Sequence, residues 1–146
     1  MHIAALLVAG DAKLDDDGAI NAWRIPTTCF EVDQIPLEVT IPLVVVVHAQ
    51  AGRDHDPQLY IVCKDPDGKR QGSIESSWHW PDDEDKLSKY RCFTHSLPFV
   101  VSAEGEYTIG VYYDSYGIAE LDTPIPLSIK LVGSDAGGGN GDATSQ

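Results

Sequence analysis

The segment from Pro42 to His48 reads P-L-V-V-V-V-H, an uninterrupted run of apolar side chains in which four consecutive residues are valine. β-branched side chains suit an extended backbone better than a helix. An apolar run that does not alternate with polar residues is typical of a strand covered on both faces. We therefore expect residues 42–48 to form the central strand of a sheet.

The rest of the chain alternates over short stretches, and no window of a dozen residues carries the apolar stripe of a helix. Turn sequences separate these stretches, and the turn at Asp17-Gly18 is expected to join residues 3–8 and 19–25 as a hairpin. Two further turns are D-P-D-G and D-S-Y-G. The other candidate strands are residues 59–63, 73–80, 91–102 as one or two strands around Pro98, 104–113, 118–121, which returns after the turn D-S-Y-G, and 127–132.

This pattern predicts an all-β fold, a two-sheet antiparallel β-sandwich of about eight strands. At most one short helical turn is expected, near residues 82–89, where Pro81 precedes acids and lysines come later. The chain length suits one domain, which we assign to residues 1–133. Residues 134–146 are rich in glycine and have no large apolar side chain to bury, so a flexible C-terminal tail is expected there.

Acidic residues outnumber basic ones by 23 to 10, for a formal net charge of −13. Such a surface repels phosphate backbones, so direct binding of nucleic acid is not expected. The acids are spread along the chain, and surface charge of this kind ordinarily keeps a protein soluble. It also suits a basic partner, so one alternative is an acidic decoy that occupies the basic groove of a nucleic-acid-binding protein.

The three cysteines, Cys29, Cys63 and Cys92, are odd in number and widely spaced, unlike those of a disulfide scaffold. Residues 1–9 are apolar, but they lack the basic start and the cleavage site of a signal peptide and are too short to span a membrane. We therefore expect a cytoplasmic protein with free thiols and no membrane association.

The segment E-G-E-Y-T-I-G-V-Y-Y at residues 104–113 resembles the penultimate strand of immunoglobulin-like sandwiches, where the tyrosine of G-x-Y caps a corner. Earlier in the chain, A-G-D-A, an acidic glycine turn, an I-x-x-W strand and a proline-flanked link lead into P-L-V-V-V-V, and D-P-D-G follows. This order is similar to a bacterial domain-of-unknown-function family of small immunoglobulin-like β-sandwich proteins. The resemblance covers most of residues 3–132. It implies an immunoglobulin-like fold and no catalytic residues.

No spacing in the sequence predicts a metal or cofactor site. Cys92 and His95 are three residues apart, which places them on opposite faces of a strand. The acid clusters at residues 15–19 and 82–86 lack the third alternating ligand of a calcium loop, although a looser site built from two loops stays open. There is no G-x-S-x-G elbow and no phosphate-binding loop. We expect no cofactor and no enzymatic activity, with a hydrolase built from dispersed residues as an alternative.

The aromatic segment S-S-W-H-W-P-D-D-E-D contains the main candidates for ligand binding. On a strand, Trp78 and Trp80 point to one face and His79 to the other. If they face inward, the tryptophans belong to the core, which is where large aromatic side chains usually lie. If they face outward, two adjacent indoles beside acids suit a sugar or a cationic group. Tyr112 and Tyr116, near the last hairpin turn, pose the same choice between packing and binding.

The sequence thus predicts a non-catalytic β-sandwich that acts as an interaction or assembly module, with an unknown protein partner or a second copy of the chain. Free sheet edges favour such pairing. The alternatives are a ligand-binding module that uses exposed aromatic side chains for a carbohydrate or a cationic group, and the acidic decoy.

Overall fold

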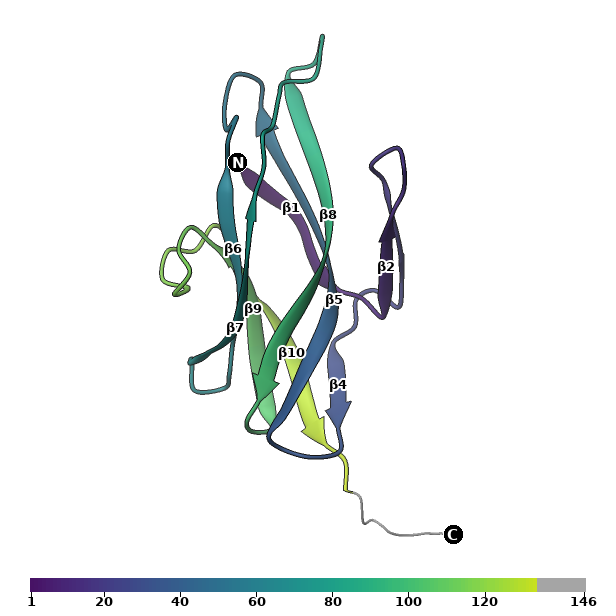
Figure 1. The fold of residues 1–146 in the computed structure, drawn as a ribbon, viewed down its shortest axis with the longest axis vertical. Coiled ribbons are helices and arrows are strands. Elements are labelled where there is room, and N and C mark those ends of the chain that lie inside the picture. The colour runs from purple at the N-terminus through teal and green to yellow at the C-terminus, as the bar shows by residue number, and fades with distance from the viewer. Residues whose placement is uncertain (134–146) are drawn as a thin grey trace.

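The valine run lies within β5 (Leu37–Gln50), the middle strand of a three-stranded sheet in the computed structural model, which describes residues 1–133 (Figure 1). β8 (Ser88–Val101) pairs with one edge of β5 along all 14 residues of that strand. β1 (His2–Val8) pairs with the opposite edge, but only along residues 43–48. The predicted central strand is therefore confirmed, and only its second half is hydrogen-bonded on both edges.

A five-stranded sheet packs against the first and has the order β4-β10-β9-β6-β7. Its neighbouring strands are antiparallel except β4 and β10, which run parallel, so the expectation of a purely antiparallel sandwich is wrong at this edge. The strands of this sheet are β4 (Cys29–Val32), β6 (Gln58–Lys64), β7 (Arg70–Ser77), β9 (Gly105–Tyr112) and β10 (Ile125–Leu131).

A short hairpin of β2 (Asp11–Leu14) and β3 (Ile20–Trp23) stands beside the three-stranded sheet (Figure 1). The predicted turn at Gly18 joins these two strands, and the φ of Gly18 is 86°, which glycine adopts without strain. The prediction that residues 19–25 pair with residues 3–8 is wrong, because β1 pairs with β5. β1 is apolar and so is the valine-rich part of β5, whereas β3 (I-N-A-W) contains a polar residue and has no buried residue.

Ten strands form within residues 1–133, against about eight predicted, and the additional ones are the short β2 and β4. Residues 91–102 lie in one strand because Pro98 points its nitrogen away from β5, where no N–H donor is needed. The strand predicted over residues 73–80 ends at Ser77. The described residues contain no helix, near residues 82–89 or elsewhere. The tail predicted for residues 134–146 lies outside the described part of the chain.

No helix in the described residues has the length and apolar character that crossing a membrane requires.

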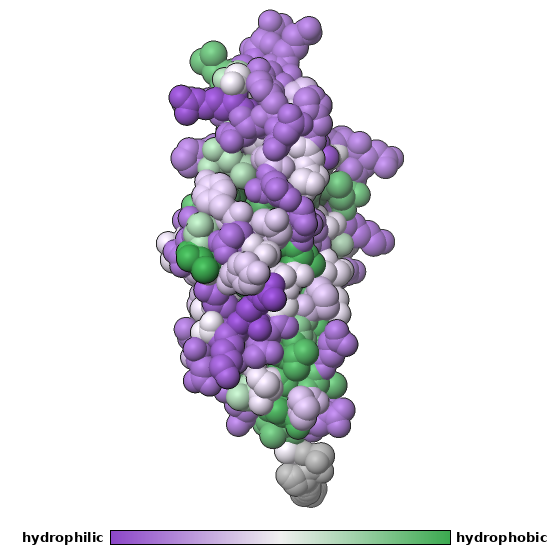
Figure 2. Space-filling model, turned by 60° about the vertical axis from the view of Figure 1, so that its left-hand side comes forward, coloured by the Kyte–Doolittle hydropathy of each residue, from purple (hydrophilic) through white to green (hydrophobic). Residues whose placement is uncertain are grey.

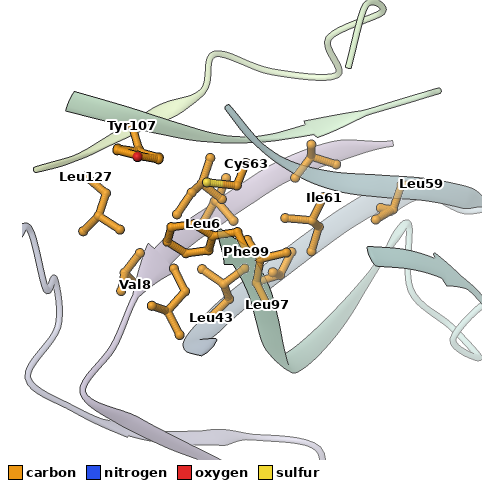
Figure 3. Packing of buried hydrophobic residues seen from close by; sticks show 14 of the residues in the cluster. Leu6, Val8, Leu43, Leu59, Ile61, Cys63, Leu97, Phe99, Tyr107 and Leu127 are labelled. Carbon is orange, nitrogen blue, oxygen red and sulfur yellow. The ribbon is translucent and has the colours of Figure 1, made fainter. Parts of the chain in front are cut away.

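The inner faces of the two sheets meet in one hydrophobic core (Figure 3). Leu59, Ile61 and Cys63 alternate along β6 and are fully buried in this core together with Leu43 of β5. Each aliphatic side chain buried in this way stabilises the fold by roughly 1.5–3 kcal/mol relative to an exposed one. Burial, and then the charge of Asp65, raises the pKa of the Cys63 thiol to about 12, so this thiol is neutral at physiological pH. All three cysteines are free.

Tyr107 fixes the chain where it turns from β8 into β9. Its ring is fully buried against Phe99, at 5.9 Å between ring centroids. Its hydroxyl donates a 2.8 Å hydrogen bond to the carbonyl oxygen of Ala103 and accepts from the N–H groups of Ser102 (3.2 Å) and Ala103 (3.3 Å). One side chain thereby satisfies three backbone groups of a loop that has no ladder partner.

We expect Tyr107→Phe to lower the free energy of unfolding by about 1–3 kcal/mol, because it removes these hydrogen bonds and leaves backbone groups without partners. Urea denaturation followed by fluorescence measures the change. Tyr113→Phe is the matched control, since Tyr113 is 55% exposed, and it should alter stability by less than about 0.5 kcal/mol. Equal stabilities of the two variants would contradict this role for Tyr107.

Candidate functional site

The two tryptophans of the aromatic segment lie at the end of the sandwich, just past β7. The chain stays beside the β5–β6 loop there. The backbone N–H of Trp78 donates to the carbonyl oxygen of Pro57 (3.4 Å), and the backbone N–H of Trp80 donates to that of His55 (2.7 Å). Trp80 is 3% exposed and belongs to the core, while Trp78 is half-buried against it. The two indoles therefore face inward, and they do not form an exposed stacking surface.

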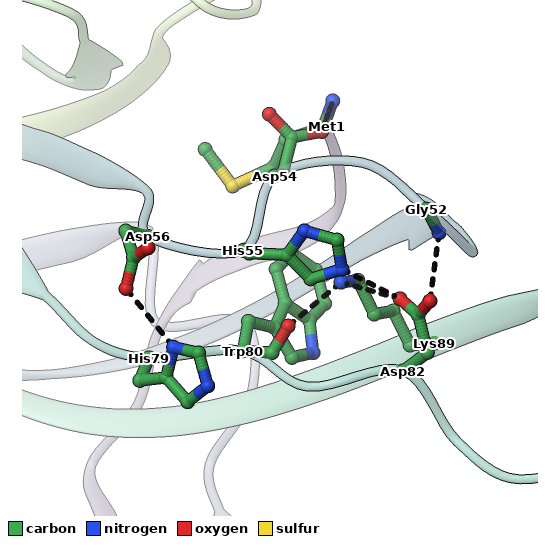
Figure 4. A network of polar contacts seen from close by, with 9 residues as sticks. All are labelled: Met1, Gly52, Asp54, His55, Asp56, His79, Trp80, Asp82 and Lys89. Carbon is green, nitrogen blue, oxygen red and sulfur yellow. Dashed lines mark hydrogen bonds and ion pairs between the residues drawn. The ribbon is translucent and has the colours of Figure 1, made fainter.

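A polar network closes this end of the sandwich around the carboxylate of Asp82 (Figure 4). Asp82 accepts hydrogen bonds from the N–H of Gly52 (2.9 Å) and from Lys89 Nζ (3.0 Å), and His55 Nε2 lies 3.2 Å from Asp82 Oδ1. These contacts, the Gly52 N–H first and Lys89 next, hold the pKa of Asp82 below its usual value. Lys89 Nζ also donates to the carbonyl oxygen of Trp80 (2.8 Å) and lies 5.0 Å above the Trp80 ring.

Lys89 is 1% exposed, which the sequence did not lead us to expect, and Asp82 belongs to this network rather than to a freely solvated acidic loop. Buried ammonium groups need partners, and Asp82, the Trp80 carbonyl and the indole ring supply them. The network ties the β5–β6 loop to the segment before β8.

His79 points outward, opposite to the tryptophans, and its Nδ1 lies 3.0 Å from Asp56 Oδ1. Both side chains of this pair are largely exposed, so the contact is weak and accessible to solvent. Within residues 1–133, no three or more His, Cys, Asp or Glu side chains are placed to hold a metal ion together. The end of the sandwich drawn in Figure 4 is thus held by paired charges that serve its own structure.

Tyr112 and Tyr116 differ sharply in exposure. Tyr112 is 1% exposed, and Lys64 Nζ lies 4.9 Å from the centre of its ring. Burial raises the pKa of Tyr112, with smaller effects from Glu120 and Asp114. Of the two roles left open for Tyr112, packing or binding, its burial favours packing. Tyr116 is 70% exposed on the segment that follows.

We call residues 113–120 the tyrosine loop; it projects from the five-stranded sheet beside β6 (Figure 1). Three large side chains of this loop are open to solvent, namely Tyr113 (55% exposed), Tyr116 (70%) and Ile118 (80%). The face of the molecule drawn in Figure 2 is mostly hydrophilic, with separate hydrophobic groups on it. The sequence indicated Tyr116, but it placed Ile118 in a returning strand, where the structure has only an isolated bridge between Tyr112 and Glu120.

The carboxylate of Asp114 fixes the backbone of the tyrosine loop. It accepts hydrogen bonds from the N–H groups of Tyr116 (3.1 Å), Ile118 (3.0 Å) and Ala119 (2.7 Å). These bonds, that of Ala119 first, hold the pKa of Asp114 below its usual value. The N–H of Tyr113 also donates to the Ala119 carbonyl oxygen at 2.8 Å, which closes the loop at its base.

Two basic side chains hold the tyrosine loop against the sheet. Lys64 Nζ donates to the carbonyl oxygen of Gly117 at 2.6 Å, and Arg70 Nη1 donates to that of Ser115 at 3.0 Å. The Arg70 guanidinium also lies 5.8 Å from the centre of the Tyr116 ring. Gly117 has a φ of 76°, and a Cβ there would lie 2.9 Å from Lys64 Cε, so glycine is required at this position. The loop is thus rigid at its backbone and apolar at its tip.

We expect Asp114→Ala to speed amide hydrogen exchange at Ile118 and Ala119, because both N–H groups lose their acceptor. The lowered pKa of Asp114 means that the stabilisation is complete above the ordinary aspartate value of about 3.9 and is lost as the pH falls through the lower folded-state value. Exchange measured by NMR at neutral pH tests this. Asp122→Ala is the control, since Asp122 accepts from Thr123 alone. Unchanged exchange in Asp114→Ala would show that the loop is fixed by something else.

Comparison of this chain with protein-family models, with curated proteins and with solved structures found no match.

Proposed function

We propose that this chain is a non-catalytic interaction module that binds another protein through the tyrosine loop. The observation that carries the proposal is the exposure of Tyr113, Tyr116 and Ile118 on a backbone already fixed by Asp114. Aromatic and aliphatic anchors supply most of the binding energy at protein interfaces. A loop that is ordered before binding loses little conformational entropy when the partner arrives.

The setting of the loop supports the same proposal. Its tip is apolar, while Arg70 and Glu120 stand beside it and offer polar contacts at the rim. An apolar centre inside a polar rim is the ordinary composition of a protein interface.

We further propose that the sandwich is of the immunoglobulin-like type. The hydroxyl of Tyr107, bonded to the backbone four residues earlier at the start of β9, supports this class, because such a tyrosine corner marks it. The resemblance to a bacterial family of unknown function remains a prediction.

The ligand-binding alternative loses support from the placement of its residues, since Trp80 and Tyr112 are buried and Trp78 faces the core. No observation favours the acidic decoy over a general protein contact. The three free cysteines fit a cytoplasmic setting, which we retain as part of the proposal.

Affinity capture from native cytosol, with the full chain as bait and at low and then high salt, tests the proposal. We expect the wild-type chain to retain a stoichiometric protein partner. The double variant Tyr116→Ser/Ile118→Ser should capture at least about tenfold less of that partner. Leu87→Ser is the matched control, because Leu87 is 91% exposed on a different loop, and it should retain the partner.

Two outcomes would contradict the proposal. Retention of the partner by the double variant would place the interface elsewhere. A wild-type chain that captures nothing and sediments as a monomer would remove protein binding as its function under these conditions.

A further inference from the structure

A cavity of about 810 Å³ opens at the edge of the sandwich opposite β7 and β8. It is bounded by the end of β1 (residues 8–10), the linker at residues 24–27, β4 (residues 29–31) and residues 40–42 of β5. It shares no residue with the tyrosine loop or with the polar network around Asp82. It is therefore a separate site from the one proposed above.

One wall of this cavity is a strand edge that has no partner among residues 1–133. The pairing between β1 and β5 ends at Leu43, and the N–H of Ala9 makes the last contact, 3.0 Å from the Pro42 carbonyl oxygen. Below that point β5 pairs only with β8. Because backbone groups alternate between the two edges of a strand, the N–H and C=O groups of Glu38 and Thr40 face the same open edge as the Pro42 carbonyl. Both residues are exposed.

The mouth of the cavity holds an arginine in a fixed position. The backbone of Arg24 has a φ of 57°, which is uncommon for a residue other than glycine. Such conformations occur often at functional sites. The aliphatic stem of Arg24 lies flat on Gly10, where an added Cβ would come within 2.9 Å of Arg24 Cδ. Its carbonyl oxygen accepts a 2.6 Å hydrogen bond from Thr27 Oγ1.

The guanidinium of Arg24 forms no ion pair with any of residues 1–133. The other charged side chain that lines the cavity is Glu31, on β4, whose register places it opposite Lys130 of β10. Arg24 is the one basic side chain among the residues that line the cavity. A carboxylate is the group that matches a guanidinium in charge and in planar geometry.

We propose that this groove binds an extended peptide bearing a carboxylate, which adds a strand to the free edge of β5 and sets its carboxylate on Arg24. Glu38 and Thr40 supply the backbone hydrogen bonds, as in other cases of strand addition. Ile25, which is 46% exposed, and the half-buried Phe30 receive an apolar side chain of the peptide. The carboxylate is the peptide's C-terminus or an acidic side chain, since both present the same group.

The probe is a pair of phage-displayed libraries of random peptides about seven residues long, near the length of an ordinary strand. One library ends in a free carboxylate and the other is displayed from its N-terminal side with a blocked end. Selection uses the full chain at about 0.15 M salt, where the Debye length is about 8 Å and repulsion from distant acids is screened. Enriched peptides are then synthesised as free acids and as amides for fluorescence anisotropy.

We expect enriched peptides to bind Arg24→Gln at least about tenfold more weakly than the wild type, because the variant lacks the charged hydrogen-bonding partner of the carboxylate. Arg53→Gln is the matched control, an exposed arginine on the β5–β6 loop, and its affinity should change by less than about twofold. Amidation that abolishes binding identifies the peptide's C-terminus as the carboxylate. Loss on changing a peptide Glu to Gln identifies a side chain.

Thr40→Pro tests the backbone contact, because it removes the N–H that faces the groove and leaves the pairing with β8 intact. The sheet already holds prolines at the neighbouring positions Pro42 and Pro98. We expect the affinity for the enriched peptides to fall about tenfold, because the variant loses a backbone hydrogen bond to the peptide. If circular dichroism shows that this variant is unfolded, Gly10→Ala, which displaces the stem of Arg24, takes its place with Arg24→Gln.

The proposal is overturned if no peptide is enriched, or if enriched peptides bind the Arg24 and Thr40 variants as tightly as the wild type. It is also overturned if the wild-type chain sediments as a dimer and Thr40→Pro as a monomer, because the occupant is then a second copy of the chain.

Discussion

The long pairing of β5 with β8 is the constraint on which the rest of the structure depends. It extends over 14 residues, and it sets the length of the three-stranded sheet and the depth of the core beneath it. β1 covers only residues 43–48 of the other edge, so the two halves of β5 have different roles. The valine-rich half is paired on both edges, although residues of both halves contribute to the core. The preceding half keeps one free edge, beside the cavity that contains Arg24.

Three of the acidic residues stabilise loops of the fold through their carboxylates. Asp82 and Asp114 each hold a loop by accepting backbone N–H groups, and Asp65 does the same at the β6–β7 turn with the N–H groups of Asp67 and Lys69. Burial alone would raise the pKa of Asp65, but these hydrogen bonds lower it. Because all three folded-state pKa values are lowered, the stability that they provide is present above the ordinary aspartate pKa and is lost as the pH falls through the folded-state values.

Local patterns in the sequence predicted what is local in the structure. The valine run predicted the central strand, and the turn sequences at Gly18 and Gly68 predicted the hairpin turns of β2–β3 and β6–β7. The third turn sequence, D-S-Y-G, forms a turn inside the tyrosine loop. The pairing of strands is harder to predict, because alternation specifies which face of a strand is buried and not which strand lies beside it. For this reason the sequence predicts β3 as the partner of β1, whereas the structure pairs β1 with β5. Lys89 is buried against Asp82 and Trp80, seven and nine residues away, in a segment without regular structure, so no strand or helix period reveals the contact. Tyr112 is buried beside Lys64, which is distant in sequence.

Native-state hydrogen exchange along β5, read residue by residue by NMR, tests most directly the claim that its two halves differ. The account predicts slow exchange at Val44 and Val46, whose N–H groups face β1, and at Val39, whose N–H group faces β8. It predicts fast exchange at Glu38 and Thr40, whose N–H groups face the open edge. Exchange at Glu38 and Thr40 as slow as that of Val44 and Val46 would contradict it, because the edge would then be covered.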